Sequence, residues 1–303
     1  MADYVDNSTI KAQAWKFYFA LAAWPAYFLV LPWVFARFGF FSLVFMVFPG
    51  LYLFTWAGFL MHESWHAYVP SVNSKFFYRA FSYALLTDPQ VYRLAHGYHH
   101  SMVHTWDDVE FHPLGHIKNG FLRVLYNSME ILFGIIFISL AGAYAVIRHP
   151  KVGKLYKFSG AALSYPLIAG YLFLLGFLSR SIFRVKVSEI VLSYAVSMLI
   201  NSFILHASQL VEHGNLIVEG DFNERNIWTR NLEPSGWPEK VFLFLTHGDS
   251  REHVLHHTLT PQYLRPFPGR APMPDKAVYI TLGDYFRILA DMFRGRVQYI
   301  TPS

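Results

Sequence analysis

The sequence predicts an all-α integral membrane protein, a bundle of about four transmembrane helices with a cytosolic helical cap. The 303-residue chain is 54% hydrophobic and only 15% charged, whereas an average soluble domain is about 25% charged. Aromatic residues make up 18% of it, and Trp and Tyr concentrate where a bilayer meets water. Several apolar runs approach the roughly 20 residues that a helix needs to cross a bilayer.

The apolar runs mark the expected spans. Four are clear, at 17–35, 40–61, 160–179 and 187–205. A further apolar run lies within 121–147, after a mixed segment that contains Arg123 and Glu130. We expect an interfacial or re-entrant helix there, so that the whole chain, 1–303, forms one membrane domain with 208–303 as its cytosolic cap.

The basic residues orient these spans. With the N-terminus in the cytosol, most Lys and Arg residues fall on the cytosolic side, while Arg37 and the trio Arg180, Arg184 and Lys186 stay outside. Every histidine-rich segment then lies on the cytosolic side. The N-terminus lacks the basic region and short apolar core of a cleaved signal peptide, so we expect the first span to be retained. Such a protein belongs in a bacterial inner membrane or a eukaryotic endoplasmic reticulum.

Composition excludes several classes of function. The chain has no cysteine, which excludes thiolate metal sites, iron–sulfur modules and cysteine nucleophiles. Its net charge of +5 suits an anionic membrane surface. No basic patch coincides with a nucleic-acid motif, so we expect no nucleic-acid partner.

Histidines carry the functional signal. Three clusters have helical spacing, namely His62 and His66; His96, His99 and His100; and His253, His256 and His257. Residues three and four positions apart share one face of a helix. Asp88 followed by proline predicts the start of the second helix, and Asp249 with Glu252 predicts the start of the third. We expect these clusters to bind metal.

Other histidines are assigned by their position. His206 and His213 are seven residues apart at the end of the last span, and His104 follows the second cluster by one turn. Isolated histidines near a membrane are usually ordinary polar residues of the interface. That is our expectation for His112, His116, His149 and His247.

The histidines leave three kinds of metal chemistry open. Residues 62–66 match the H-E-x-x-H motif of zinc proteases, with Glu63 as base, but that reading leaves the other clusters unexplained. A non-catalytic metal carrier or sensor is a second possibility, although the histidines follow span ends on one side and do not line a pore. Nitrogen ligands without thiolate suit iron, zinc or copper, and nine imidazoles suffice for two ions. Two irons with O2 can attack an unactivated C–H bond.

The three clusters resemble, in order and separation, the histidine boxes of the integral-membrane fatty acid desaturase superfamily. That superfamily also contains hydroxylases, carotenoid ketolases and alkane monooxygenases, and the resemblance covers roughly residues 15–265. It implies two non-haem Fe ions, O2 as co-substrate, and desaturation or hydroxylation of a fatty acyl or other lipid-like chain. It also implies an external electron donor, such as a ferredoxin, a rubredoxin or a b-type cytochrome with its reductase. Alkane monooxygenase-like oxidation and alkene-forming decarboxylation of a fatty acid are alternatives.

The resemblance also implies individual site residues. The family adds a histidine after the last span, preceded by an amide, and here His213 and Gln209 take these places. Tyr263 after the third box resembles the alkane monooxygenase branch, whereas the second box has one residue fewer than that branch before its His-His pair. His104 and His206 are extra candidate ligands. Ligand histidines usually donate their second ring N–H to a carboxylate, and the acidic candidates are Glu63, Asp107, Asp108, Glu212 and Glu252.

Two predictions concern the C-terminal cap. Thr281 and Asp284 have the spacing of a capping box, so we expect a helix to start there. The proline-rich stretch 261–274 is expected to be an extended loop.

Overall fold

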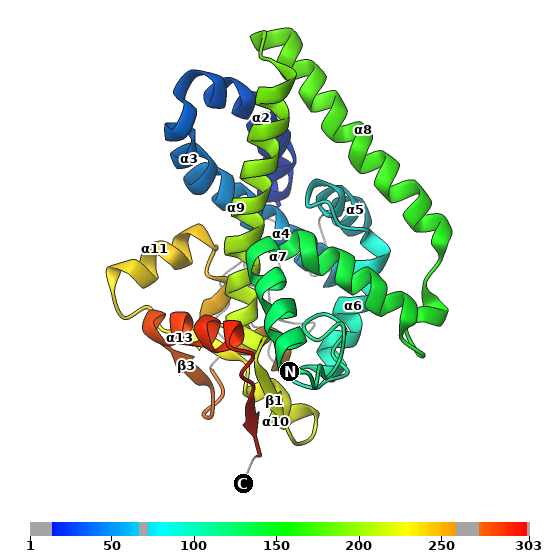
Figure 1. Ribbon diagram of the computed structural model, residues 1–303, viewed down its shortest axis with the longest axis vertical. Helices are drawn as coiled ribbons and strands as arrows, with labels where there is room; N and C mark the ends of the chain where they lie inside the picture. The colour runs from blue at the N-terminus through cyan, green and yellow to red at the C-terminus, as the bar shows by residue number, and fades with distance from the viewer. Residues whose placement is uncertain (1–13, 67–71, 259–272, 302–303) are drawn as a thin grey trace.

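Figure 1 shows a computed structural model of the chain, which describes residues 14–66, 72–258 and 273–301. The protein is mostly helical. In chain order the helices are α2 (Trp15–Phe38), η1 (Gly39–Phe41), α3 (Ser42–Phe45), η2 (Met46–Gly50), α4 (Leu51–His66), α5 (Ser74–Ala84), α6 (Pro89–Met102), α7 (Gly120–Arg148), η3 (Gly153–Leu155), α8 (Phe158–Phe183), α9 (Val187–His213), α10 (Phe222–Ile227), α11 (Trp237–Leu245), η4 (Asp249–Arg251), α12 (His253–Thr258) and α13 (Leu282–Phe293). Tyr263 and most of the stretch 261–274 lie outside the described residues.

Four short strands add to the helices that the sequence predicts. They are β1 (Leu216–Val218), β2 (Arg230–Leu232), β3 (Val278–Ile280) and β4 (Gln298–Ile300). β1 pairs with β4 and β2 pairs with β3, both in parallel. Each pair joins segments far apart in the sequence, so the strands connect the C-terminal segment to the residues that follow α9.

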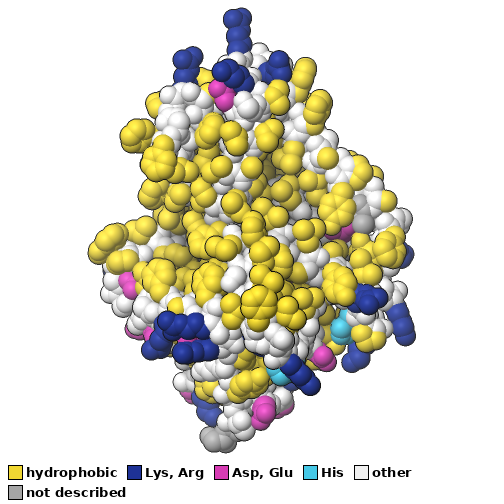
Figure 2. Space-filling model, viewed as in Figure 1, with side chains coloured by type: hydrophobic (Ala, Val, Ile, Leu, Met, Phe, Trp, Pro, Cys, Tyr) yellow, Lys and Arg dark blue, Asp and Glu magenta, His cyan; other side chains and the backbone are white. Residues whose placement is uncertain are grey.

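Four helical stretches of the described chain are long and apolar enough to cross a membrane, namely Trp15–His66, Gly120–Arg148, Phe158–Phe183 and Val187–His213. The last two contain the predicted spans 160–179 and 187–205. The first stretch contains both 17–35 and 40–61. The chain turns between them at Gly39, where φ is +53°, so that α4 packs back against α2. In Figure 2 hydrophobic side chains cover the broad middle of the molecule, and Lys and Arg gather toward its two ends.

Helix α7 is sharply bent (Figure 1). Gly134 has φ 51° and ψ −130°, outside the helical region. The Ser202 hydroxyl of α9 donates to the Phe133 carbonyl at 2.8 Å and accepts from the Ile136 N–H at 3.0 Å, so it bonds backbone groups beside the bend. Each half of α7 is about 14 residues or roughly 20 Å long, less than the ~30 Å hydrocarbon core. By total length and composition α7 is one of the four candidate spans, and the interfacial or re-entrant helix expected at 121–147 stays a prediction.

The C-terminal segment is tied to the end of α9 by a buried arginine. The Arg230 guanidinium donates to the Val211 carbonyl at 2.9 Å and to the side-chain oxygens of Asn215 and Gln298 at 3.0 Å each. Burial lowers the pKa of Arg230 to about 10. Helix α13 begins as predicted, with the Thr281 hydroxyl accepting from the Asp284 N–H at 3.2 Å.

Replacing Gly134 by Ala is expected to destabilise the protein by several kcal/mol. A Cβ atom at this position would lie 2.1 Å from the Ser202 carbonyl oxygen, and φ is in the left-handed region. Thermal unfolding in detergent measures the effect. The matched control is Gly120→Ala in the same helix, where a Cβ meets nothing within 4 Å; equal stability of the two variants would contradict the role of the bend.

Candidate metal centre

Helix α4 carries the first pair of histidines at its end. His62 and His66 stand one turn apart, and their ring centroids are 4.7 Å from each other. Glu63 is fully buried beside them. The pair therefore lies at the end of Trp15–His66, the longest of the apolar helical stretches among the described residues.

Helix α6 begins as predicted and carries the second cluster. The Asp88 carboxylate accepts from the N–H groups of Gln90 and Val91 at 2.6 and 3.2 Å, and Pro89 occupies the first helical position. The helix ends at Met102, so His104 lies beyond it, with φ +59°.

Helix α12 carries the third cluster and is positioned by a buried asparagine. The Asn231 side-chain oxygen accepts from the Val254 N–H at 3.1 Å, and its amide donates to the Val278 carbonyl at 3.0 Å. The prediction that this helix begins at Asp249 is wrong: the 3-10 turn η4 occupies Asp249–Arg251, and the α-helix starts at His253. The strand pair β2–β3 thus holds the start of α12.

Five histidines from α4, α6 and α12 converge into what we call the first group, consisting of His62, His66, His96, His100 and His256. One ring nitrogen of each lies within 4.8 Å of the others. Four contacts between Nε2 atoms link them, at 3.0 Å for His62–His256, 3.0 Å for His256–His100, 3.1 Å for His100–His96 and 3.4 Å for His96–His66.

Four histidines form the second group, which consists of His99, His213, His253 and His257. Ring nitrogens of His99, His213 and His257 lie within 4.8 Å of one another. The Nε2 atom of His253 is 2.9 Å from that of His213 and 3.3 Å from that of His257. His213 comes from the end of α9, so this group joins α9 to α6 and α12.

The two groups adjoin because consecutive histidines are divided between them. His99 and His100 follow each other on α6, as do His256 and His257 on α12, and neighbouring residues on a helix point in different directions. Their ring centroids are 5.7 Å apart in the first pair and 5.3 Å in the second. The structure thus brings together the eight histidines of the three clusters and His213.

Acidic side chains behind the groups orient the imidazoles. Nδ1 of His62 contacts Glu63 at 3.1 Å, that of His96 contacts Glu110 at 2.9 Å, that of His99 contacts Asp108 at 2.7 Å, and that of His253 contacts Glu212 at 3.1 Å. A neutral imidazole has one N–H, so donation from Nδ1 leaves the Nε2 lone pair directed into the group. Such convergent lone pairs fit a bound cation.

His104 orients His213 in the same way. Its Nδ1 donates to the Arg225 carbonyl at 2.8 Å, and its Nε2 lies 3.1 Å from Nδ1 of His213. With its Nδ1–H bonded to a carbonyl, the His104 Nε2 accepts from His213. His104, an extra candidate ligand from the sequence, therefore lies behind His213 and outside both groups.

The other sequence-predicted residues lie in different places. Asp107 is exposed, and Glu252 lies 3.7 Å from Arg251. His206 is in neither group; its Nδ1 lies 3.3 Å from the Gln209 oxygen. The histidines expected to be ordinary polar residues are those at positions 112, 116, 149 and 247. None of these four falls in either group.

Glu110 is the site residue that sequence analysis missed. Asp108 Oδ1 accepts from the N–H groups of Glu110 and Phe111 at 3.0 and 3.3 Å, and this turn directs Glu110 back toward His96. The sequence does contain a signal for Glu110, namely the acidic run after the second cluster, from which only Asp107 and Asp108 were predicted as site residues.

Burial and crowding keep most of these imidazoles neutral. Burial, followed by the neighbouring imidazoles, holds the pKa values of His256 and His257 well below their usual range, and burial also lowers the pKa of His253. His99 differs: burial lowers its pKa, but Asp108 together with Glu110 and Glu212 raises that pKa by more. At Asp108 burial raises the pKa, but His99 together with His112 and the Glu110 N–H lowers it by more. Neutral imidazoles backed by ionised carboxylates make a donor set suited to a cation.

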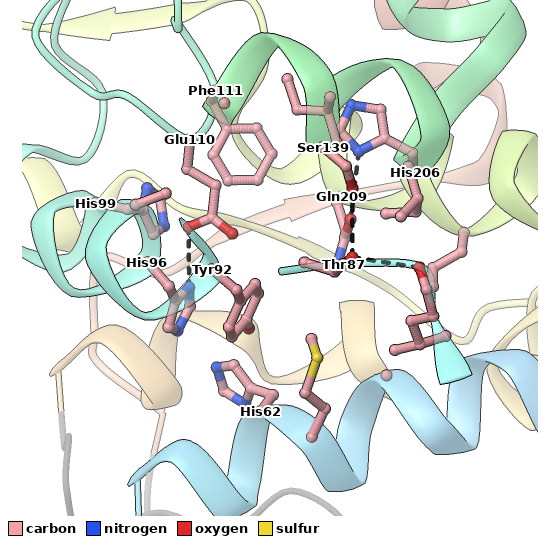
Figure 3. Close-up of a pocket in the computed structure, with 18 of the residues that line it drawn as sticks. His62, Thr87, Tyr92, His96, His99, Glu110, Phe111, Ser139, His206 and Gln209 are labelled. Atoms are coloured by element: carbon pink, nitrogen blue, oxygen red, sulfur yellow. Dashed lines mark hydrogen bonds and ion pairs between the residues drawn. The ribbon is translucent and has the colours of Figure 1, made fainter. Parts of the chain in front are cut away.

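A cavity of about 120 Å³ borders both groups (Figure 3). His62 and His96 line it beside the first group, and His99, His213 and His253 beside the second. Apolar side chains form most of the remaining wall, for example Phe54, Ile135 and Leu205. The site therefore combines a candidate metal centre with space for an apolar molecule.

Lowering the pH is expected to destabilise the metal-free protein. Histidines of an unfolded chain titrate near about 6.5, whereas the folded pKa values of His100, His253, His256 and His257 lie lower. Below about pH 6.5 the unfolded chain then binds more protons, and the free energy of unfolding falls. His99 has a raised pKa in the folded protein and so stabilises it at lower pH, but it is one group against these four. Thermal unfolding of metal-free protein across this window should show a falling melting temperature, and a constant or rising one would contradict the assignment.

Replacing Glu110 by Gln is expected to lower metal affinity roughly 10- to 100-fold, because His96 loses the carboxylate that fixes its tautomer. The matched control is Asp107→Asn, three residues earlier, where the side chain is exposed. Metal content after dialysis against a graded chelator measures both. Equal metal retention by the two variants would remove Glu110 from the site.

Comparisons with known proteins return no match. No protein-family model matches the chain, and neither the curated proteins nor the solved structures give a significant similarity. The resemblance to the desaturase superfamily stays a prediction, carried by the spacing of the histidines.

Proposed function

We propose that this protein is a membrane-embedded, non-haem di-iron oxidoreductase that uses O2 to oxidise an aliphatic C–H bond of a lipid-like chain, by desaturation or hydroxylation. The observation that carries the proposal is the convergence of nine buried or half-buried histidines into two adjoining groups beside a mostly apolar cavity. Imidazole ligation without thiolate suits iron as well as zinc and copper.

Charge balance supports two metal ions. Glu63 and Glu110 stand behind the first group, and Asp108 and Glu212 behind the second. Two carboxylates per group offset the charge of two divalent cations, because imidazole ligands are neutral. Buried charges are tolerated where they are paired in this way.

Each part of the chain has a role in the proposed reaction. The histidines would hold the metals through Nε2, and the carboxylates would keep the Nδ1 protons in place and fix the ring orientation. The apolar cavity wall excludes water and positions the chain to be oxidised. Tyr92 stacks on His96, with centroids 5.1 Å apart at 9°, and limits the movement of that ring. Two bound irons would supply O2 activation and hydrogen abstraction from carbon.

Electrons and substrate would come from outside the chain. Since the sequence contains no cysteine, the reductant would be a separate ferredoxin, rubredoxin or b-type cytochrome. The substrate would enter from the membrane, and the histidine groups would face the cytosol, as the distribution of basic residues predicts.

The zinc-protease alternative has weaker support. It needs Glu63 as a base acting on a metal-bound water, whereas here Glu63 contacts the Nδ1 side of His62, away from the converging Nε2 atoms. It also leaves the second group without a purpose. About one zinc per chain, with peptidase activity that is lost in Glu63→Gln, would favour it over our proposal.

Expression of the protein is expected to produce O2-dependent oxidised lipids or hydrocarbons that His256→Ala abolishes, because His256 belongs to the first group. Mass spectrometry of cell extracts measures the products, and iron analysis of the purified protein should give about two irons per chain. The matched control is His149→Ala, outside both groups, which should retain activity. Full activity of His256→Ala in an iron-replete preparation would overturn the proposal.

A further inference from the structure

The cavity has a polar inner end that the metal groups do not use. Figure 3 shows Thr87, Ser139, His206 and Gln209 together, on the side away from His62. Thr87 Oγ1 and Ser139 Oγ are 3.3 Å apart. All four side chains line the cavity, and three of them come from the long apolar helices α7 and α9.

A buried carboxylate stands behind this polar end. Glu130 Oε1 lies 3.3 Å from Nε2 of His206, and both residues are almost fully buried. On the other side of the ring, Nδ1 of His206 faces Gln209 at 3.3 Å. Ionisable residues within apolar helices are costly and usually serve a function. The Glu130–His206 pair holds the Gln209 side chain in place. As placed, the Gln209 oxygen faces His206, which leaves its NH2 group for the cavity, and the flipped amide presents the oxygen to the cavity instead.

The charge of the wall restricts what can bind at this end. Among the described residues that line the cavity there is no Lys or Arg, while the acids Glu110 and Glu212 line it beside the metal groups. A carboxylate or phosphate would thus be buried without a cation, at a high cost. A plain hydrocarbon would bury the hydroxyls and the amide against CH2 groups, which also costs free energy.

We propose that the inner end of the cavity binds an uncharged oxygen, a hydroxyl or a carbonyl, carried by a long apolar substrate. The substrate class is then a neutral oxygenated lipid, such as a fatty alcohol or aldehyde, and not a plain alkane or a free acid. A substrate hydroxyl pairs with the Gln209 oxygen or with the oxygens of Thr87 and Ser139. A substrate carbonyl accepts from the Gln209 NH2 group or from Ser139, because the Thr87 hydroxyl donates to the Leu85 carbonyl at 3.2 Å. The statement that such a molecule is oxidised rests on the proposed function, whereas the binding preference does not.

The test compares four ligands of equal chain length, namely decane, decanol, decanal and decanoate. Binding is read from the ligand-dependent rise in melting temperature of zinc-loaded protein, which cannot turn over. Decanol or decanal should bind at least about tenfold more tightly than decane and decanoate, because two hydrogen bonds are gained and no charge is buried. Tighter binding of decanol than of decanal indicates recognition of a hydroxyl, and the reverse order indicates recognition of a carbonyl.

The double variant Thr87→Val with Ser139→Ala should remove most of this preference. The matched control is Ser164→Ala, a buried serine of the apolar helix α8 whose hydroxyl donates to the Gly160 carbonyl and does not line the cavity. It should keep the wild-type order.

Equal or tighter binding of decane or decanoate to the wild type would overturn the proposal, as would an unchanged preference in the double variant. Turnover of iron-loaded protein is measured separately, so binding of decanol without any O2-dependent product would reject the proposed function and leave this inference standing.

Discussion

The hydrogen bonds that the Nδ1–H groups of the histidines donate are the constraint on which the site depends. Each one leaves a lone pair on Nε2, and the lone pairs of His213 and His253 meet at 2.9 Å. Bringing unshared lone pairs so close is unfavourable unless a cation lies between them. The buried partners, among them Glu63 and Asp108, hold the rings in this arrangement before any ion binds. A metal centre of this kind is pre-organised by its carboxylates as much as by its ligands.

The fold meets this constraint by bringing the ends of four helices together. Dividing the His99–His100 and His256–His257 pairs between two groups allows two short helices to serve both. The bend at Gly134 is a second device, because it turns the later half of α7 so that Ile135 and Ser139 form part of the cavity wall.

The cavity wall consequently differs in character from one region to another. Histidines border it beside the metal groups, aliphatic and aromatic side chains form most of the remaining wall, and hydroxyl and amide groups lie together on the side away from His62 (Figure 3). In the proposed reaction the first region supplies the oxidant, the second excludes water, and the third determines which chain enters and how far. Regiochemistry would then follow from the separation between the polar end and the metals, since the fold holds both rigidly.

The sequence by itself determined the elements that depend on local spacing. The apolar runs, the start of α6 at Asp88, the capping box at Thr281 and the eight histidines of the three clusters could all be predicted, because helix geometry places residues three and four apart on one face. Only the tertiary structure decided which histidines share a group, and that Glu110 contacts His96 while Asp107 faces solvent. The strand pairs and the contact of Ser202 with the bend in α7 likewise appear only there. These features join segments tens of residues apart, and local periodicity carries no information about such distances.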